Sequence, residues 1–147
     1  MKDTFIHQYE SQVAHAPLPL QLAETYSISS IIKDTTDKKV YLLKDQRNQP
    51  FILKCCSSMY AGVLRQEYDF LTHHTNMDCF PDAVTFFEES DMCFLLRDYI
   101  KGPLLGEHSE HLYAQYTHFR DFENALLPYM MECCQIISIL HHEKPPM

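Results

Sequence analysis

The chain has 147 residues, 46% of them hydrophobic, and its 12 Lys and Arg against 20 Asp and Glu give a formal net charge of −8. This length allows one hydrophobic core or little more, which disfavours a multi-domain enzyme. The negative charge and the scattered basic residues argue against a nucleic-acid partner.

The cysteines and the amino terminus indicate the cellular compartment. Cysteines occur as the adjacent pairs Cys55-Cys56 and Cys133-Cys134, with Cys79 and Cys93 between them. Adjacent cysteines suit neither disulfides nor the C-x-x-C spacing of zinc sites, so we expect reduced, structural thiols. No apolar run has the length of a signal peptide or of a membrane span, which predicts a cytoplasmic protein without a membrane partner.

Hydrophobic periodicity changes along the chain. Residues 1–25 predict a short amphipathic segment followed by an extended tether. The next six elements are, in chain order, strands over 26–32, 40–43 and 51–56, a helix over 61–74, and strands over 83–88 and 92–99 that form a hairpin about the turn 89–91. Lys101-Gly102-Pro103 ends this part of the chain.

The remainder is helical, with a segment near 107–119 and a longer helix that reaches His142. We expect Pro128 in the first turn of the longer helix, because a proline in a helix interior costs about 3 kcal/mol. That helix is apolar on nearly all sides and needs cover. We therefore predict a homo-oligomer, most simply a twofold dimer, or a protein partner that covers the 127–142 helix.

Three clusters have a functional and a structural interpretation. The pairs His73-His74 and His141-His142 could suggest a metal, but adjacent helical residues point in different directions, so we expect solvent-facing helix ends and no metal site. Cys55 and Cys56 could be reactive, but cysteines in an apolar strand are usually packed and inert. Aromatic residues at helical spacing, Tyr113, Tyr116 and Phe119, are either a docking surface or ordinary packing.

A single lysine, Lys54, follows Phe51-Ile52-Leu53 in an otherwise apolar strand, and the next helix carries Glu67. A buried ammonium is costly unless a carboxylate or phosphate meets it, and Glu67 is the nearest candidate. With the order three strands, helix, two strands and helices, the chain from about Tyr26 to Met147 resembles the small lobe of protein kinases. The resemblance is closest to the bacterial serine/threonine kinases of eukaryotic type.

The resemblance implies an α+β fold, in which a five-stranded antiparallel sheet with one helix is followed by a hinge and two helices. It divides the chain into an amino-terminal extension (1–25), a kinase-like small lobe (26–100) and a hinge with the helical start of the large lobe (101–147). In the family the lysine holds the ATP phosphates and the glutamate orients it. The implied nucleotide-binding residues are Lys54, Glu67, Val40, Ile52, and the backbone groups of Asp98 and Ile100 at the hinge.

The chain also departs from the family. The segment 33–40, aligned with the glycine-rich loop, has Lys33, Thr35 and Lys38 where glycines are expected, and Arg97 stands at the back of the adenine pocket. The catalytic base and the metal ligands of phosphoryl transfer, carried by H-R-D and D-F-G motifs, do not occur in the sequence. We therefore expect weak or no binding of ATP with Mg.

The preferred interpretation is a truncated, catalytically inactive kinase-like domain that acts as a binding or regulatory module. The alternative is the amino-terminal, ATP-binding portion of an active serine/threonine kinase. A third interpretation is a related small-molecule phosphotransferase, because such enzymes share the small lobe.

Overall fold

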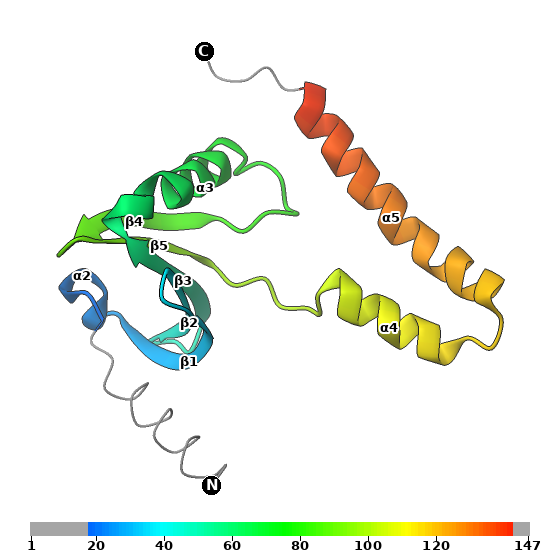
Figure 1. The fold of residues 1–147 in the computed structure, drawn as a ribbon, viewed down its shortest axis with the longest axis horizontal. Coiled ribbons are helices and arrows are strands. Elements are labelled where there is room, and N and C mark those ends of the chain that lie inside the picture. Colours follow the sequence, from blue (N-terminus) through cyan, green and yellow to red (C-terminus); the bar gives the residue numbers. More distant parts are fainter. Residues whose placement is uncertain (1–17, 143–147) are drawn as a thin grey trace, which may run out of the picture. The chain divides into compact units, whose positions relative to one another are not determined.

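The structure is a computed structural model that describes residues 18–142, so most of the predicted extension 1–25 lies outside the described residues. The chain divides into two compact units, one ending at Ile100 and the other beginning at Lys101 (Figure 1).

The first unit is built on one sheet of five strands. The strands are β1 (Tyr26–Asp34), β2 (Lys38–Asp45), β3 (Pro50–Ser57), β4 (Ala83–Glu89) and β5 (Met92–Asp98). They lie in the order β1-β2-β3-β5-β4, and every neighbouring pair is antiparallel. The short 3₁₀ helix η1 (Ser58–Tyr60) and the helix α3 (Ala61–His73) connect β3 to β4. The predicted α+β class, with a five-stranded antiparallel sheet and one helix, is confirmed.

The predicted hairpin of β4 and β5 is also confirmed. Its two central residues are Ser90 and Asp91, with φ angles of 51° and 62°. Positive φ at both positions is the mark of a type I′ turn, whose twist matches that of the flanking strands. The two strands of the hairpin can therefore stay paired up to the turn without a change in their twist.

Both faces of the sheet are covered, each by a different helix (Figure 1). On one face the helix α2 (Leu20–Ala23) brings Leu22 against a cluster formed with Leu43, Phe51, Leu53 and Leu96. On the other face α3 brings Leu64 against Cys56, Cys93 and Leu95. Because β3 is buried on both sides, its sequence is a continuous apolar run and not an alternating one.

The carboxyl-terminal end of α3 differs from the prediction. His74 is buried, although we expected the pair His73-His74 at a solvent-facing helix end. The ring of His74 lies 4.2 Å from that of Phe70 and 6.2 Å from that of Phe80, and its Nδ1 is 2.7 Å from the Phe70 carbonyl oxygen. A carbonyl oxygen only accepts, so Nδ1 carries the proton and donates. The aromatic cover that buries His74 comes partly from the loop after the helix, which the helical pattern alone does not show.

The second unit is a pair of helices, α4 (Leu105–Gln115) and α5 (Phe119–His142). They contact through aromatic pairs, with ring centroids 5.3 Å apart for Tyr113 and Phe122 and 4.7 Å apart for His108 and Tyr129. Tyr113 thus takes part in packing between the helices. No helix within residues 18–142 has both the length and the apolar character that crossing a membrane requires.

The expected position of Pro128 is wrong, because it lies in the interior of α5 and not in its first turn. The helix begins earlier, at Phe119, and Asp121 supplies a negative charge to its first turn, which the helix dipole favours. Phe122, in the turns before the proline, packs on Tyr113 of α4. This packing stabilises the helical turns before Pro128, and it outweighs the free energy that the proline costs the helix.

Candidate functional site

Strand β3 places Lys54 on the sheet face that α3 covers. In the ladder Lys54 lies opposite Val40 of β2 and Leu95 of β5, and its side chain is only 16% exposed. Burial lowers the pKa of the Lys54 ammonium below its usual range, and the hydrogen bond to Glu67 opposes that shift. A lysine in this position requires a partner of opposite charge.

Helix α3 supplies that partner. Glu67 lies one helical turn from the buried Leu64 and Leu71, so the face of the helix that packs on the sheet also carries the carboxylate. The Nζ atom of Lys54 donates to both carboxylate oxygens of Glu67, at 2.6 and 2.8 Å. The predicted pairing of Lys54 with Glu67 is confirmed.

A second cation meets the same carboxylate, which sequence reasoning missed. Arg97 lies opposite Ile52 in the ladder between β3 and β5, and its Nε is 3.5 Å from Oε1 of Glu67. Its Nη1 donates to the carbonyl oxygen of Asp98 at 3.3 Å, while Nε is buried and has no hydrogen-bond partner within the described residues. Lys54, Glu67 and Arg97 therefore form one charge cluster with two positive groups and one negative group.

The strand register explains why the sequence did not reveal this contact. Residues 52 and 54 share a face of β3, but whether residue 97 joins that face depends on the pairing of two strands separated by α3 and β4. The signal that could have found the contact is the two-residue spacing from Leu95, a buried apolar residue, to Arg97.

The turn between β1 and β2 takes the place of the glycine-rich loop in the predicted nucleotide site. The Thr35 hydroxyl donates to the Lys38 carbonyl oxygen at 2.8 Å and accepts from the Lys38 N–H at 3.1 Å, so a side chain closes the turn. Lys39 and Asp34 form an exposed ion pair at 3.7 Å. Without glycine the turn lacks the close backbone approach that favours phosphate, and Asp34 and Asp37 offset part of the positive charge of its lysines.

The other predicted binding residues fall into two groups. Val40 and Ile52 share the face of the sheet with Lys54, as strand alternation requires. Asp98 pairs with Phe51, so its side chain belongs to the opposite face, and Ile100 follows the end of β5. The Asp98 N–H donates to the Asp82 carbonyl oxygen at 2.9 Å, and the Asp98 carbonyl oxygen accepts from Arg97. Both backbone groups of Asp98 are thus already paired with protein.

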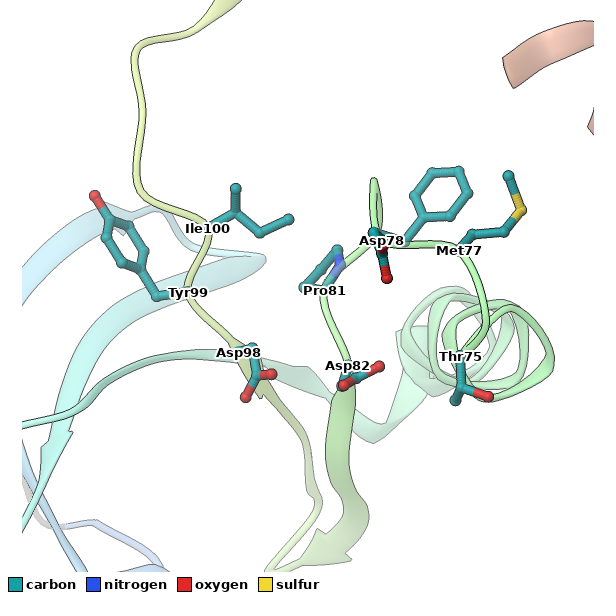
Figure 2. A pocket seen from close by; sticks show the side chains of 9 residues that line it. Thr75, Met77, Asp78, Pro81, Asp82, Asp98, Tyr99 and Ile100 are labelled. Carbon is teal, nitrogen blue, oxygen red and sulfur yellow. The ribbon is translucent and has the colours of Figure 1, made fainter. Parts of the chain in front are cut away.

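A pocket of about 290 Å³ lies beside the ends of β4 and β5, away from the Lys54 pair. Figure 2 shows Asp82 and Asp98 at adjacent strand ends and Ile100 extending toward Pro81. Burial, and then the nearby charge of Asp82, raise the pKa of Asp98. The pocket is lined by Thr75, Met77, Asp78, Phe80, Pro81, Asp82, Asp98, Tyr99 and Ile100. Over residues 18–142 no group of three or more His, Cys, Asp or Glu side chains is arranged to hold a metal ion.

Cys55 and Cys56 are both buried, on opposite faces of β3, as expected for packed thiols. Burial raises the pKa of the Cys55 thiol to about 11, and the neighbouring Lys39 only partly opposes it. A thiol with this pKa is protonated at neutral pH and is a poor nucleophile.

Comparisons with known proteins give a likeness in fold. No family model and no curated protein sequence matches the chain. Among solved structures the chain is similar to Rad53 1-466 in complex with AMP-PNP, with 15% sequence identity and a TM-score of 0.46. The match covers 61% of this chain and 25% of the Rad53 chain in that structure.

Proposed function

We propose that this chain is a kinase-like small lobe that acts as a binding or regulatory module and does not bind ATP with Mg strongly. The observation that carries the proposal is the contact of Arg97 with Glu67, on the face of the sheet where Lys54 would meet a nucleotide. A cytoplasmic location and descent from the bacterial kinases of eukaryotic type belong to the same proposal.

The ion pair of Lys54 and Glu67 supports the kinase-like part of the proposal. In kinases a strand lysine contacts the α- and β-phosphates, and a glutamate of the following helix holds that lysine in place. Here the two groups come from the corresponding strand and helix and are joined by two short hydrogen bonds. The arrangement is the one that the resemblance implies.

The surroundings of the pair support the part that concerns nucleotide binding. By the resemblance, an adenine ring would approach Ile52 and Arg97, and it would meet a guanidinium that Glu67 and the Asp98 carbonyl oxygen already hold. The Asp98 N–H would have to exchange its bond to the Asp82 carbonyl oxygen for one to adenine, and the Asp98 carbonyl oxygen already accepts one bond from Arg97. The turn closed by Thr35 adds no phosphate contacts of the glycine type. The guanidinium and the paired Asp98 N–H therefore oppose adenine binding, and the turn provides no compensating phosphate contact.

The binding role is assigned to the second unit. Along one side of α5 a shallow, open apolar groove is lined by Leu127, Met130, Met131, Cys134, Gln135 and Ser138. Several of these side chains are about half exposed, which is unusual for so apolar a helix. We propose that a second copy of the chain, or a protein partner, covers the 127–142 helix along this groove.

Titration of the full chain with Mg-ATP tests the proposal, by calorimetry and by the melting temperature. A ligand that binds only the folded state raises the melting temperature once its concentration exceeds its dissociation constant. We expect no saturable heat and no rise in melting temperature up to millimolar ATP, and the same result for Lys54→Met. A dissociation constant below about 1 mM that is lost in Lys54→Met would overturn the proposal.

The second candidate is the ATP-binding portion of an active serine/threonine kinase. The closed pair of Lys54 and Glu67 favours it, because the lysine is already held in place for phosphate contact. The same titration separates the two candidates, since only this one expects Mg-ATP affinity that depends on Lys54.

A further inference from the structure

Two buried cysteines face each other across the centre of the sheet. Cys56 of β3 and Cys93 of β5 are direct partners in the ladder, and their Sγ atoms are 3.1 Å apart. Both side chains lie on the face covered by α3, in the cluster with Leu64 and Leu95. They are 5% and 0% exposed, so large reagents do not reach them in the folded state.

The position of the two residues suits a covalent bond. Residues directly opposite each other in an antiparallel pair have Cα atoms about 4.5 to 5.5 Å apart, within the range found in disulfides. The sulfur atoms would have to approach by about 1 Å to reach the bond length of a disulfide, about 2.05 Å. We propose that Cys56 and Cys93 are an oxidation site, which hydrogen peroxide converts into a disulfide between β3 and β5.

The reaction needs only peroxide as oxidant. One thiol loses its proton, attacks a peroxide oxygen and breaks the O–O bond, which gives a sulfenic acid and water. The second thiol then attacks the sulfenic sulfur, the S–S bond forms, and a second water leaves. In total two thiols lose two hydrogen atoms, and one peroxide is reduced to two waters.

Burial makes the first step slow and the second step selective. Burial, together with the contact to Cys56, raises the pKa of Cys93 to about 12, so the reactive thiolate is scarce at neutral pH. Peroxide is small and neutral, which makes it the oxidant best able to reach the pair. Once either sulfur is a sulfenic acid, its partner is already in contact and captures it before further oxidation.

The neighbouring cysteines provide contrast within the same chain. Cys55 lies on the opposite face of β3, where its Sγ donates to the Lys39 carbonyl oxygen at 3.7 Å. Cys79 and Cys134 are exposed. Among the described residues the sulfur contact joins Cys56 to Cys93 and involves none of these three.

The test is to expose the folded chain to hydrogen peroxide, remove the peroxide, unfold the chain in denaturant to alkylate the remaining thiols, and digest with trypsin without reduction. Cleavage after Lys54, Arg65 and Arg97 places Cys56 in the peptide 55–65 and Cys93 in the peptide 66–97. Because these peptides also hold Cys55 and Cys79, the experiment uses Cys55→Ala/Cys79→Ala as the parent variant. We expect the two peptides to be linked in the parent and unlinked after Cys93→Ala is added.

A second readout is the melting temperature, which should rise by about 10 °C in the oxidised parent, because the bond closes a long loop in the unfolded chain. The reductant dithiothreitol should reverse the rise. Oxidation of the exposed Cys134 reports that the peroxide treatment was sufficient. Recovery of Cys56 and Cys93 as alkylated thiols, or as sulfinic acids, in a sample in which Cys134 is oxidised would overturn the proposal.

Discussion

Glu67 is the residue on which the charge cluster of the first unit depends. Among the described residues it is the carboxylate that meets both Lys54 and Arg97, and all three side chains are mostly buried. Removing Lys54 leaves Glu67 with Arg97, whereas neutralising Glu67 leaves two cations close together. We expect Glu67→Gln to lower the free energy of unfolding by about 2 kcal/mol, and Lys54→Met by about half as much.

Urea unfolding of Glu67→Gln and Lys54→Met measures which variant loses more free energy of unfolding. Asp34→Asn is the control, because its pair with Lys39 is exposed and 3.7 Å long. It should change the free energy of unfolding by about 0.5 kcal/mol at most. A larger loss for Lys54→Met than for Glu67→Gln would show that Arg97 does not interact with the carboxylate in solution.

Cys55 predicts a dependence of stability on pH. Burial raises its pKa from the ordinary 9.0 to about 11, so the folded state keeps a proton that the unfolded state loses. The stability that this group contributes is fully present below pH 9 and is lost as the pH rises toward 11. The advantage of the wild type over Cys55→Ala in free energy of unfolding should therefore shrink by about 1 kcal/mol between pH 8 and pH 10.

Urea unfolding at the two pH values, with reductant present, checks this expectation. Cys79→Ala, which changes an exposed thiol, should keep the pH dependence of the wild type. If Cys55→Ala keeps it too, the Cys55 thiol is not protected by burial.

Among the elements, the hairpin of β4 and β5 allows a test of backbone conformation. Asp91 has a φ of 62°, which a residue with a Cβ adopts at a cost and glycine does not. Asp91→Gly and Asp91→Ala remove the same carboxylate, so their difference reports the backbone alone. We expect the glycine variant to be about 1 kcal/mol more stable than the alanine variant in urea unfolding. Equal stabilities would mean that the turn changes conformation in the variants.

Two features of the helices and strands could be predicted from the sequence alone. Lys54 and Glu67 could be predicted as a pair, because a lone lysine in an apolar strand needs a carboxylate and the next helix offers one. The turn at Ser90 and Asp91 could be predicted from its polar residues between two apolar runs. Local patterns decide both features.

The features that were missed depend on contacts between distant segments. The interior position of Pro128 depends on packing of Phe122 against α4, and the burial of His74 depends on Phe80 in the next loop. The contact of Arg97 with Glu67 depends on the register of β3 and β5. Periodicity describes one element at a time, so it does not contain this information.

For the whole molecule, the groove on α5 predicts self-association. We expect a twofold dimer at micromolar concentration in multi-angle light scattering, because Met131 and its neighbours in the groove are about half exposed. Met131→Glu should weaken the dimer at least about tenfold, since burying a charge in place of a methionine costs more than about 1.4 kcal/mol.

Ile139→Glu is the matched control, since Ile139 is similarly exposed on α5 but does not line the groove. It should leave the dimer intact. A monomer at micromolar concentration in the wild type, or equal effects of the two variants, would contradict a dimer formed through this groove.

The strand order has a consequence for how fast the first unit folds. β1, β2 and β3 pair with their neighbours in sequence, and so do β4 and β5, but the two groups meet only where β3 pairs with β5. That pairing encloses α3 and joins residues as far apart as Phe51 and Asp98. The entropy of closing this loop must be lost before the central contacts form, which raises the relative contact order. The docking of β5 on β3 is therefore the step at which folding of this unit is slowest, and the three-stranded meander and the hairpin on either side of it can form and unfold many times before the sheet is complete.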